Sequence, residues 1–273
     1  MDFTIITANL NHGRFLRDCL ASVAAQEGVS VQHIVIDGGS TDDSQAIVES
    51  FPQVVWSQGK DKGMSDAINK GFDRARGTWV MWLNADDRLK PGALARIKQA
   101  AGESTADVIY GDYDFVDESG NFLRSVKVPG WSPFVNVHHH CYIGSTACFF
   151  RRVSVLDPGY RLREDFHYVM DGEFFARLHE RGLHFTHVPV VVAEFRMHGG
   201  NASLRYLGKT RDMDAILKAE RQHVESRAIR RAYGLTLFED PYLNGLSDGL
   251  LWMVARGWKG ILKLIGGMTG PRV

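Results

Sequence analysis

Short runs of apolar residues alternate with segments of helical spacing over the first 112 residues of the chain. Apolar runs bounded by turn residues predict buried strands over residues 3–8, 31–36, 54–56, 78–83 and 107–110. Between them, one-sided apolar patterns predict helices over residues 14–26, 40–51, 64–76 and 91–101, the second opening with a capping box at 40–43. This alternation predicts an α/β fold whose mostly parallel sheet carries helices on both faces.

The pattern changes after residue 112. Residues 112–127 are typical of a hairpin with Asp117-Glu118-Ser119-Gly120 at its turn. Apolar β-rich runs predict strands over 147–150 and 184–196, and helical spacing predicts a helix over 169–180. Beyond Asn201 the chain has a helical and basic pattern.

Composition excludes several classes of protein. Lys+Arg and Asp+Glu both number 32, and this balance argues against a dedicated nucleic-acid binder. The three cysteines (Cys19, Cys141 and Cys148) are odd in number and form no CxxC, which indicates neither a disulfide framework nor a thiolate zinc site. We find no signal-peptide pattern and no apolar run of about 18 residues, so we expect a cytoplasmic protein without a spanning helix.

Acidic residues follow three of the predicted strands. Asp37 ends one strand, Asp86 and Asp87 end another, and Asp112 ends a third. Each alone is equally well explained as a helix cap or loop acid, but ligands of open parallel sheets bind at the carboxyl ends of strands. Carboxylates gathered there repel unless a cation holds them, and oxygen ligands suit Mg²⁺ or Mn²⁺. The sequence therefore predicts a divalent cation that neutralises a diphosphate.

The segments VIDGGSTDDS, DKGMSDAINKGFDRARGTWVMWLNADD and VIYGD resemble, in this order, bacterial family-2 glycosyltransferases of GT-A (Rossmann-like) fold. The resemblance covers roughly residues 3–204. It implies a catalytic domain over 1–204, with a nucleotide-sugar-binding half (1–112) and an acceptor half (113–204), and leaves 205–273 as a helical C-terminal extension. It also implies an inverting, metal-dependent transfer from a nucleoside-diphosphate sugar, with a UDP-sugar favoured, in cell-surface polysaccharide or lipid-linked glycan synthesis.

The resemblance assigns the donor site to the first half of the chain. Asp37 would contact the nucleotide and Asp61, in the DKG segment, would line the base pocket. Thr7 and Asn9 would face the base or the ribose; a strand-end turn explains them equally well.

The DxD motif of the family corresponds to Asn84-Ala85-Asp86 in this chain. The resemblance makes Asp86 a metal ligand. Position 84 departs from the family pattern, since asparagine replaces aspartate. Asp87 is either a helper or a cap of the next turn.

The acceptor half carries the residue expected to act as base. The family places its general base in a D-x-[DE] pattern, which Asp171-Gly172-Glu173 matches. Asp171 would take the proton of the acceptor hydroxyl as the new bond forms. Capping of the predicted helix is the simpler role for Asp171, and Glu173 is either structural or an acceptor contact.

The segment from Arg196 to Ser203 resembles the R-x-H-x-x-N-x-S pattern that closes this domain in relatives. His198 would be the second metal ligand, and Arg196 would lie near the phosphates or near Asp171. Three consecutive histidines at 138–140 are a weaker metal candidate, because neighbours in an extended segment point to alternating sides. We expect them in a polar acceptor-channel loop.

The tail has an amphipathic pattern. Its apolar positions fall at helical spacing: Leu250, Leu251, Val254, Trp258, Ile261, Leu262 and Ile265. Its basic positions fall on a different face: Arg256, Lys259 and Lys263. Such a helix over 249–269 either binds the inner face of an anionic membrane or packs on protein.

Other functions predict different motifs. A NAD-dependent dehydrogenase requires G-x-G-x-x-G after the first strand, where this chain has ANLNHG. A sugar-nucleotide pyrophosphorylase requires a glycine-rich G-x-G-x-R loop there. The remaining alternative is a non-catalytic sensor or scaffold that binds a nucleotide sugar.

Overall fold

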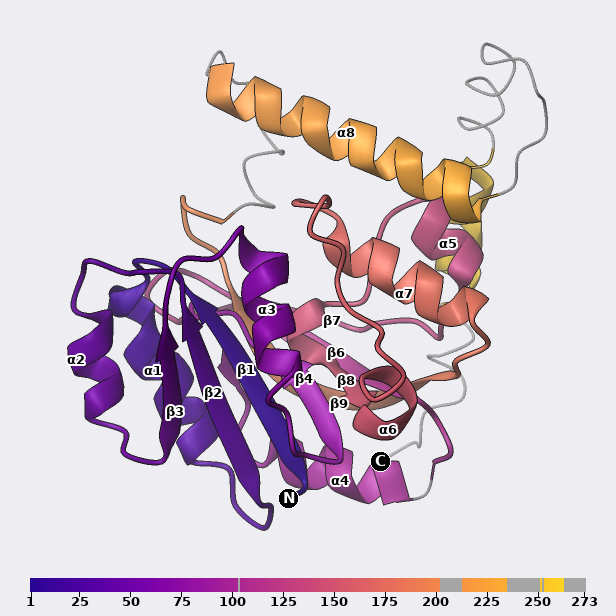
Figure 1. The fold of residues 1–273 in the computed structure, drawn as a ribbon. Coiled ribbons are helices and arrows are strands. Elements are labelled where there is room, and N and C mark those ends of the chain that lie inside the picture. Colours follow the sequence, from indigo (N-terminus) through magenta and orange to yellow (C-terminus); the bar gives the residue numbers. More distant parts are fainter. Residues whose placement is uncertain (103, 202–212, 235–250, 252, 263–273) are drawn as a thin grey trace.

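The computed structural model describes residues 1–102, 104–201, 213–234, 251 and 253–262. Within these residues, nine strands form one sheet in the order β3-β2-β1-β4-β8-β6-β9-β5, and β7 pairs with β6 (Figure 1). The strands are β1 (Phe3–Asn9), β2 (Val31–Asp37), β3 (Val54–Gln58), β4 (Trp79–Trp82), β5 (Arg88–Leu89), β6 (Val108–Val116), β7 (Phe122–Val126), β8 (Cys148–Arg151) and β9 (Phe185–Arg196). The helices are α1 (Gly13–Ala24), α2 (Ser44–Glu49), α3 (Met64–Phe72), α4 (Ala93–Gly102), α5 (Pro133–His138), the 3-10 turn η1 (Ser145–Ala147), α6 (Arg152–Val155), α7 (Met170–Glu180) and α8 (Met213–Tyr233).

The sheet is parallel in its first half and mixed in its second. The strands β3, β2, β1 and β4 pair in parallel, as the strand–helix alternation predicted. The short strand β8 then runs antiparallel to both β4 and β6, and β9 pairs in parallel with β6. Because two reversals restore the direction, β1, β4, β6 and β9 all point the same way. Their carboxyl ends therefore lie at one edge of the sheet.

Helices cover both faces of the sheet (Figure 1). Successive strand residues point to opposite faces. Ile5 packs in a cluster with Ile97 of α4, whereas its neighbour Ile6 packs with Ile68 of α3 and Phe174 of α7. The buried face of α1 joins α2 and α4 on the first side, and α5 joins α3 and α7 on the second.

Two helix boundaries differ from the sequence pattern. The helix α2 begins at Ser44, since Ser40 donates its hydroxyl to Asp37 at 2.6 Å instead of capping a helix. The predicted capping box is therefore wrong. The helix α3 ends at Phe72, because the chain turns there and the N–H of Arg76 donates to Thr4 Oγ1 at 3.1 Å.

Asp112 was expected at a strand end, and this was wrong because β6 continues to Val116. Asp112 lies in the middle of β6. Its Oδ1 accepts the N–H of Val128 at 2.8 Å and lies 2.8 Å from Nε2 of His187. These bonds fasten the segment after β7 and β9 to β6, which is a structural role.

The C-terminal part packs on the second face of the sheet. The helix α8 contacts α7 and α5 (Figure 1). In the helix at 253–262, Ala255 is buried and Leu262 packs against the core, whereas Trp258 and Ile261 are about half exposed. The predicted apolar face is thus divided between a packed side and an open side. Leu250, Lys263 and Ile265 lie outside the described residues.

No helix among the described residues has both the length and the apolar character needed to cross a membrane.

Candidate active site

Thr7 and Asn9 tie the end of β1 to its surroundings. Both are buried. Thr7 Oγ1 lies 3.0 Å from Nε2 of His33, and Asn9 Nδ2 donates to Asp37 at 2.7 Å. These bonds support the turn at the end of β1, and a contact of the pair with the base or the ribose stays a prediction.

Asp37, at the end of β2, shapes the turn that follows it. Its Oδ1 accepts the N–H groups of Gly39 and Ser40 at 2.9 and 2.7 Å, and its Oδ2 accepts from the Ser40 hydroxyl. Burial raises the pKa of Asp37, but the hydrogen bonds from Ser40, Asn9 and Gly39 outweigh burial and leave this pKa lowered. The carboxylate is therefore ionised and holds the loop in a fixed conformation.

Asp61 is brought against this same turn. Its Oδ1 accepts the N–H of Gly63 at 2.9 Å. A β-carbon on Gly38 would lie 2.6 Å from Asp61 Oδ2, so only glycine at 38 permits this approach. The VIDGG and DKG segments, predicted to serve one nucleotide site, are thus in contact.

Three side chains from three strand ends meet at the carboxyl edge. His12 follows β1, Asp86 follows β4 and His198 follows β9. One ligand atom from each lies within 4.8 Å of the others, the only such group among the residues that the structure describes. His198 Nε2 donates to Asp86 Oδ2 at 2.8 Å, and the N–H of Gly200 donates to His198 Nδ1 at 3.0 Å. The Asp86 side chain is 15% exposed, so the cluster opens to solvent on that side.

Sequence reasoning placed two of these three residues and missed His12. Asn11 turns the chain toward the cluster with a φ of 54°, a left-handed conformation that asparagine tolerates better than most residues. Its Oδ1 accepts the N–H of Thr41 at 2.8 Å, which holds that turn. The available signal was the position of His12 three residues after a strand, at the edge where ligands bind.

Asp87 holds the segment Asn84-Ala85-Asp86 in place from the buried side. This residue is 1% exposed; its Oδ1 accepts the N–H of Arg196 at 2.9 Å and its Oδ2 accepts from Asn84 at 3.0 Å. Burial, and then the charge of Asp86, raise the pKa of Asp87 well above its usual range. The bond to Asp87 needs a donor at position 84, which the amide of asparagine supplies and an ionised carboxylate would not. Ala85 packs beneath, with α1 and α2.

Arg196 supports the same segment and is 2% exposed. Its guanidinium donates to the carbonyls of Asp86 and Glu118 and to the carboxylate of Asp18, each at 2.9 Å. The expected place of this guanidinium was near the phosphates or Asp171. In the structure its bond to the Asp86 carbonyl fixes the backbone behind the Asp86 carboxylate, and a contact with the phosphates or with Asp171 stays a prediction.

Asp171 is the second residue of α7, so it is not the N-cap, which is Val169. Its Oδ1 accepts the N–H of Gly172 at 2.7 Å. It interacts electrostatically with Cys148, the first residue of β8, and with Tyr113, in the second half of β6. Both positions lie toward the carboxyl edge of the sheet. Burial raises the pKa of Asp171 to about 6, against the opposing effect of the Gly172 hydrogen bond.

Glu173 has a structural role. It is fully buried, pairs with Arg177 at 2.8 Å and accepts the hydroxyl of Tyr233 at 2.8 Å. It therefore links α7 to α8.

The histidines at 138–140 do not form a metal cluster. His138 is 2% exposed, and Lys259 donates to His140 Nε2 at 2.7 Å. Burial lowers the pKa of His139 to about 4, helped by Lys259 and Arg256. This segment contacts the C-terminal helix.

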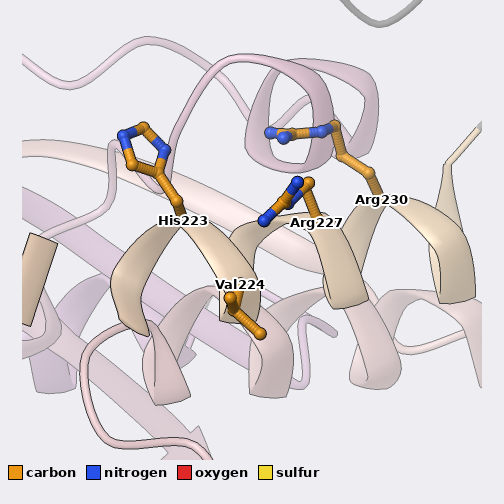
Figure 2. Close-up of a pocket in the computed structure, with 4 residues that line it drawn as sticks. All are labelled: His223, Val224, Arg227 and Arg230. Atoms are coloured by element: carbon orange, nitrogen blue, oxygen red, sulfur yellow. The ribbon is translucent and has the colours of Figure 1, made fainter. Parts of the chain in front are cut away.

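A surface hollow on α8 lies apart from the strand ends. It is lined by His223, Val224, Arg227 and Arg230 (Figure 2). Figure 2 shows His223, Arg227 and Arg230 on the same side of the helix. No residue of the cluster at the carboxyl edge lines it.

The order of the sheet and the helices on both of its faces are those of the GT-A fold. Residues 4–158 match the family model described as glycosyl transferase family 2, and the chain belongs to this family.

The chain is similar to known family members and solved structures. It is 32% identical over 211 residues to a PGL/p-HBAD biosynthesis glycosyltransferase of Mycobacterium bovis, covering 72% of this chain and 78% of that protein. It is 31% identical over 126 residues to the succinoglycan biosynthesis protein ExoO of Rhizobium meliloti, covering 45% of this chain and 36% of ExoO.

Two solved structures share the fold. One is Staphylococcus aureus TarS in complex with UDP-GlcNAc, with a TM-score of 0.63, 16% identity and coverage of 95% of this chain and 80% of that one. The other is the mannosyltransferase PcManGT from Pyrobaculum calidifontis in complex with GDP-Man and Mn²⁺, with a TM-score of 0.56, 16% identity and coverage of 96% and 84%.

Proposed function

We propose that this glycosyltransferase uses a divalent cation and Asp171 to move a sugar, with inversion, from a nucleoside-diphosphate sugar to an acceptor hydroxyl. The observation that carries the proposal is the meeting of His12, Asp86 and His198 at the sheet edge toward which Asp171 also lies. The acceptor is a cell-surface polysaccharide or a lipid-linked glycan. The names of the mycobacterial and rhizobial relatives support this acceptor class.

Asp171 has the properties of a general base. A carboxyl group with a pKa of about 6 is ionised at neutral pH, yet it is a stronger proton acceptor than an ordinary aspartate. Attack of the acceptor oxygen on the anomeric carbon, opposite the leaving diphosphate, inverts that carbon. The acceptor proton passes to Asp171, and the bonding pair leaves with the diphosphate.

The cluster at the sheet edge fits a divalent cation of the Mn²⁺ type. One carboxylate and two imidazoles, within 4.8 Å of one another, form a donor set that suits Mn²⁺ better than Mg²⁺. The ion would act as a Lewis acid that stabilises the charge developing on the diphosphate. His198 Nε2 carries its proton toward Asp86 while Gly200 donates to Nδ1, so ligation through Nε2 requires the proton to move to Nδ1 and Gly200 to turn away.

The donor site would comprise the two loops that touch at Gly38 and Asp61. We favour a UDP-sugar. The TarS complex contains UDP-GlcNAc and the PcManGT complex contains GDP-Man, and both donors serve as probes for this chain.

Thermal unfolding with nucleotide and Mn²⁺, followed by a hydrolysis assay, tests the proposal. We expect one of UDP or GDP to raise the melting temperature in the presence of Mn²⁺, since a ligand that binds only the native state stabilises it. We also expect the corresponding sugar nucleotide to be hydrolysed. Metal-dependent binding with no hydrolysis and no transfer to acceptor extracts would instead support the non-catalytic sensor or scaffold.

We further propose that the chain acts at the inner face of the cell membrane through the open side of the helix at 253–262. Val254, Trp258 and Ile261 share that side and are each about half exposed. An amphipathic helix with Trp and nearby basic residues binds anionic lipid surfaces. Trp258→Gln should reduce co-sedimentation with phosphatidylglycerol vesicles. Equal co-sedimentation of the two proteins would contradict this localisation.

A further inference from the structure

One face of α8 is turned toward the start of α7. Glu225, Ile229 and Tyr233 are spaced four residues apart, which places them on the same side of the helix. Glu225 is 9% exposed and Ile229 is 5% exposed. This stripe belongs to the C-terminal extension, yet the residues that it contacts surround Asp171.

Glu225 holds the segment that leads into α7. Its Oε1 accepts the N–H of His167 at 3.0 Å, and its Oε2 accepts the N–H groups of Tyr168 and Val169 at 2.9 and 3.2 Å. A carboxylate that accepts three backbone N–H groups fixes the peptide planes of three consecutive residues. The negative charge also favours the positive end of the α7 dipole, where Val169 supplies no side-chain cap.

The other two members of the stripe contact the residues just after Asp171. The hydroxyl of Tyr233 donates to Glu173 Oε1 at 2.8 Å. A β-carbon on Gly172 would lie 4.0 Å from Ile229 Cδ1 and 3.2 Å from Cys141 Cβ, so the backbone at 172 lies close to both. The C-terminal extension therefore contacts the chain both before and after residue 171.

We propose that Glu225 is a positioning residue, through which α8 fixes the direction of the Asp171 carboxylate, so that the C-terminal extension is part of the catalytic apparatus. This inference rests on the proposed role of Asp171 as base. The carboxylate bonds to the N–H of its own neighbour, Gly172, which moves with it. Its direction in space must therefore come from the backbone on either side, and Glu225 holds residues 167–169, which only Met170 separates from Asp171.

The test compares Glu225→Gln and Glu225→Ala with Glu180→Gln in the full chain. Glu180 is exposed and is the last residue of α7. Glu180→Gln also removes one negative charge, but at the end of α7 opposite to the one that Glu225 contacts. The rate of amide hydrogen exchange at residues 167–169 shows whether Glu225 still accepts their N–H groups. The kcat and KM for donor hydrolysis report the chemistry, with the best wild-type donor from a panel of UDP-, GDP- and dTDP-sugars in Mn²⁺.

Both Glu225 variants should exchange the amides at 167–169 faster. Their kcat should fall roughly 10- to 100-fold, as a misplacement of about 1 Å can cause, while donor KM changes by less than about twofold. Glutamine retains one accepting oxygen, so its effect should be the smaller of the two. Glu180→Gln should behave as wild type in both measurements.

A double mutant separates this inference from the proposed function. If Glu225 acts through Asp171, Glu225→Gln should not slow the residual hydrolysis of Asp171→Asn any further. Wild-type kcat in the Glu225 variants, beside an inactive Asp171→Asn, would overturn the positioning role alone. Full activity of Asp171→Asn would overturn the proposed base, while amide exchange would still report whether Glu225 anchors the segment. If Glu225→Ala does not fold, Glu225→Gln decides.

Discussion

The donor-side loops and the start of α7 are held in place in different ways. After β2, Asp37 is fixed by the N–H groups of the next residues and by Asn9 on the adjacent strand. Before α7, the chain is fixed by Glu225, more than fifty residues further along. The loop after β2 is thus held by residues of its own and the adjacent motif, whereas the segment before α7 is held by a residue of the C-terminal extension. Changes in the extension should therefore affect chemistry and leave donor binding intact.

The largest effect expected from this comparison follows Asp171→Asn. Hydrolysis or transfer should fall by about 10²- to 10⁴-fold, because the amide cannot accept the acceptor proton. Donor affinity, measured by thermal shift with Mn²⁺, should remain within about twofold of wild type. Asp165→Asn, an exposed change a few residues earlier, is the control. Retention of most activity would move the base to another residue.

Loss of a proposed metal ligand should have the next largest effect. Asp86→Asn, His198→Ala and His12→Ala should each weaken Mn²⁺ binding by about 10-fold or more, since even partners of ligands contribute that much. Calorimetric titration with Mn²⁺ measures this directly. His184→Ala, at an exposed histidine, should change nothing. An unaltered Mn²⁺ affinity in His12→Ala would remove His12 from the ligand set.

The pH dependence of kcat should be controlled by the α7 side of the site. Burial raises the pKa of Asp171 to about 6, so below that pH the group carries a proton and cannot act as base. At saturating Mn²⁺ and donor, kcat should rise about tenfold per pH unit below 6 and level above it. The groups interacting with Asp171 have pKa values raised by burial and stay neutral in this range: Tyr113, Cys141 and Cys148. A rising limb centred near 4 would mean that Asp171 is hydrated during turnover.

The smallest effect should come from the donor side. In Gly38→Ala the new β-carbon would meet Asp61 Oδ2, and the flexible carboxylate would move away. Loss of its bond to the Gly63 N–H corresponds to about 1 kcal/mol, or roughly a fivefold weaker donor affinity. The kcat should stay unchanged, which is the opposite of the Glu225 variants. Gly59→Ala, where a β-carbon meets no atom within 4 Å, is the control for titrations with UDP and GDP. A fall in kcat would show that the two regions are coupled.

The sequence by itself determined what is local. Apolar spacing predicted most of the strands, the helices α1 to α4 and α7, and the parallel first half of the sheet, but not β5, α5 or α6. The DGG, DKG and Asn84-Ala85-Asp86 segments indicated the edge of the sheet that carries the candidate site. Such features are encoded within a few turns of helix or one strand, so they can be predicted without knowledge of the partners. Of the three side chains that meet at the carboxyl edge, Asp86 and His198 could be singled out because each lies in a family motif.

Only the tertiary structure decided which distant residues meet. His12 joins His198 because β1 and β9 end at the same edge, although the mixed second half of the sheet could not be deduced from the alternation. Asp112 does not lie at a strand end, as the sequence predicted, because β6 continues past it to Val116. Glu225 reached the start of α7 because α8 packs across that helix. Strand order, strand length and helix docking depend on packing over the whole chain, and no local pattern contains them.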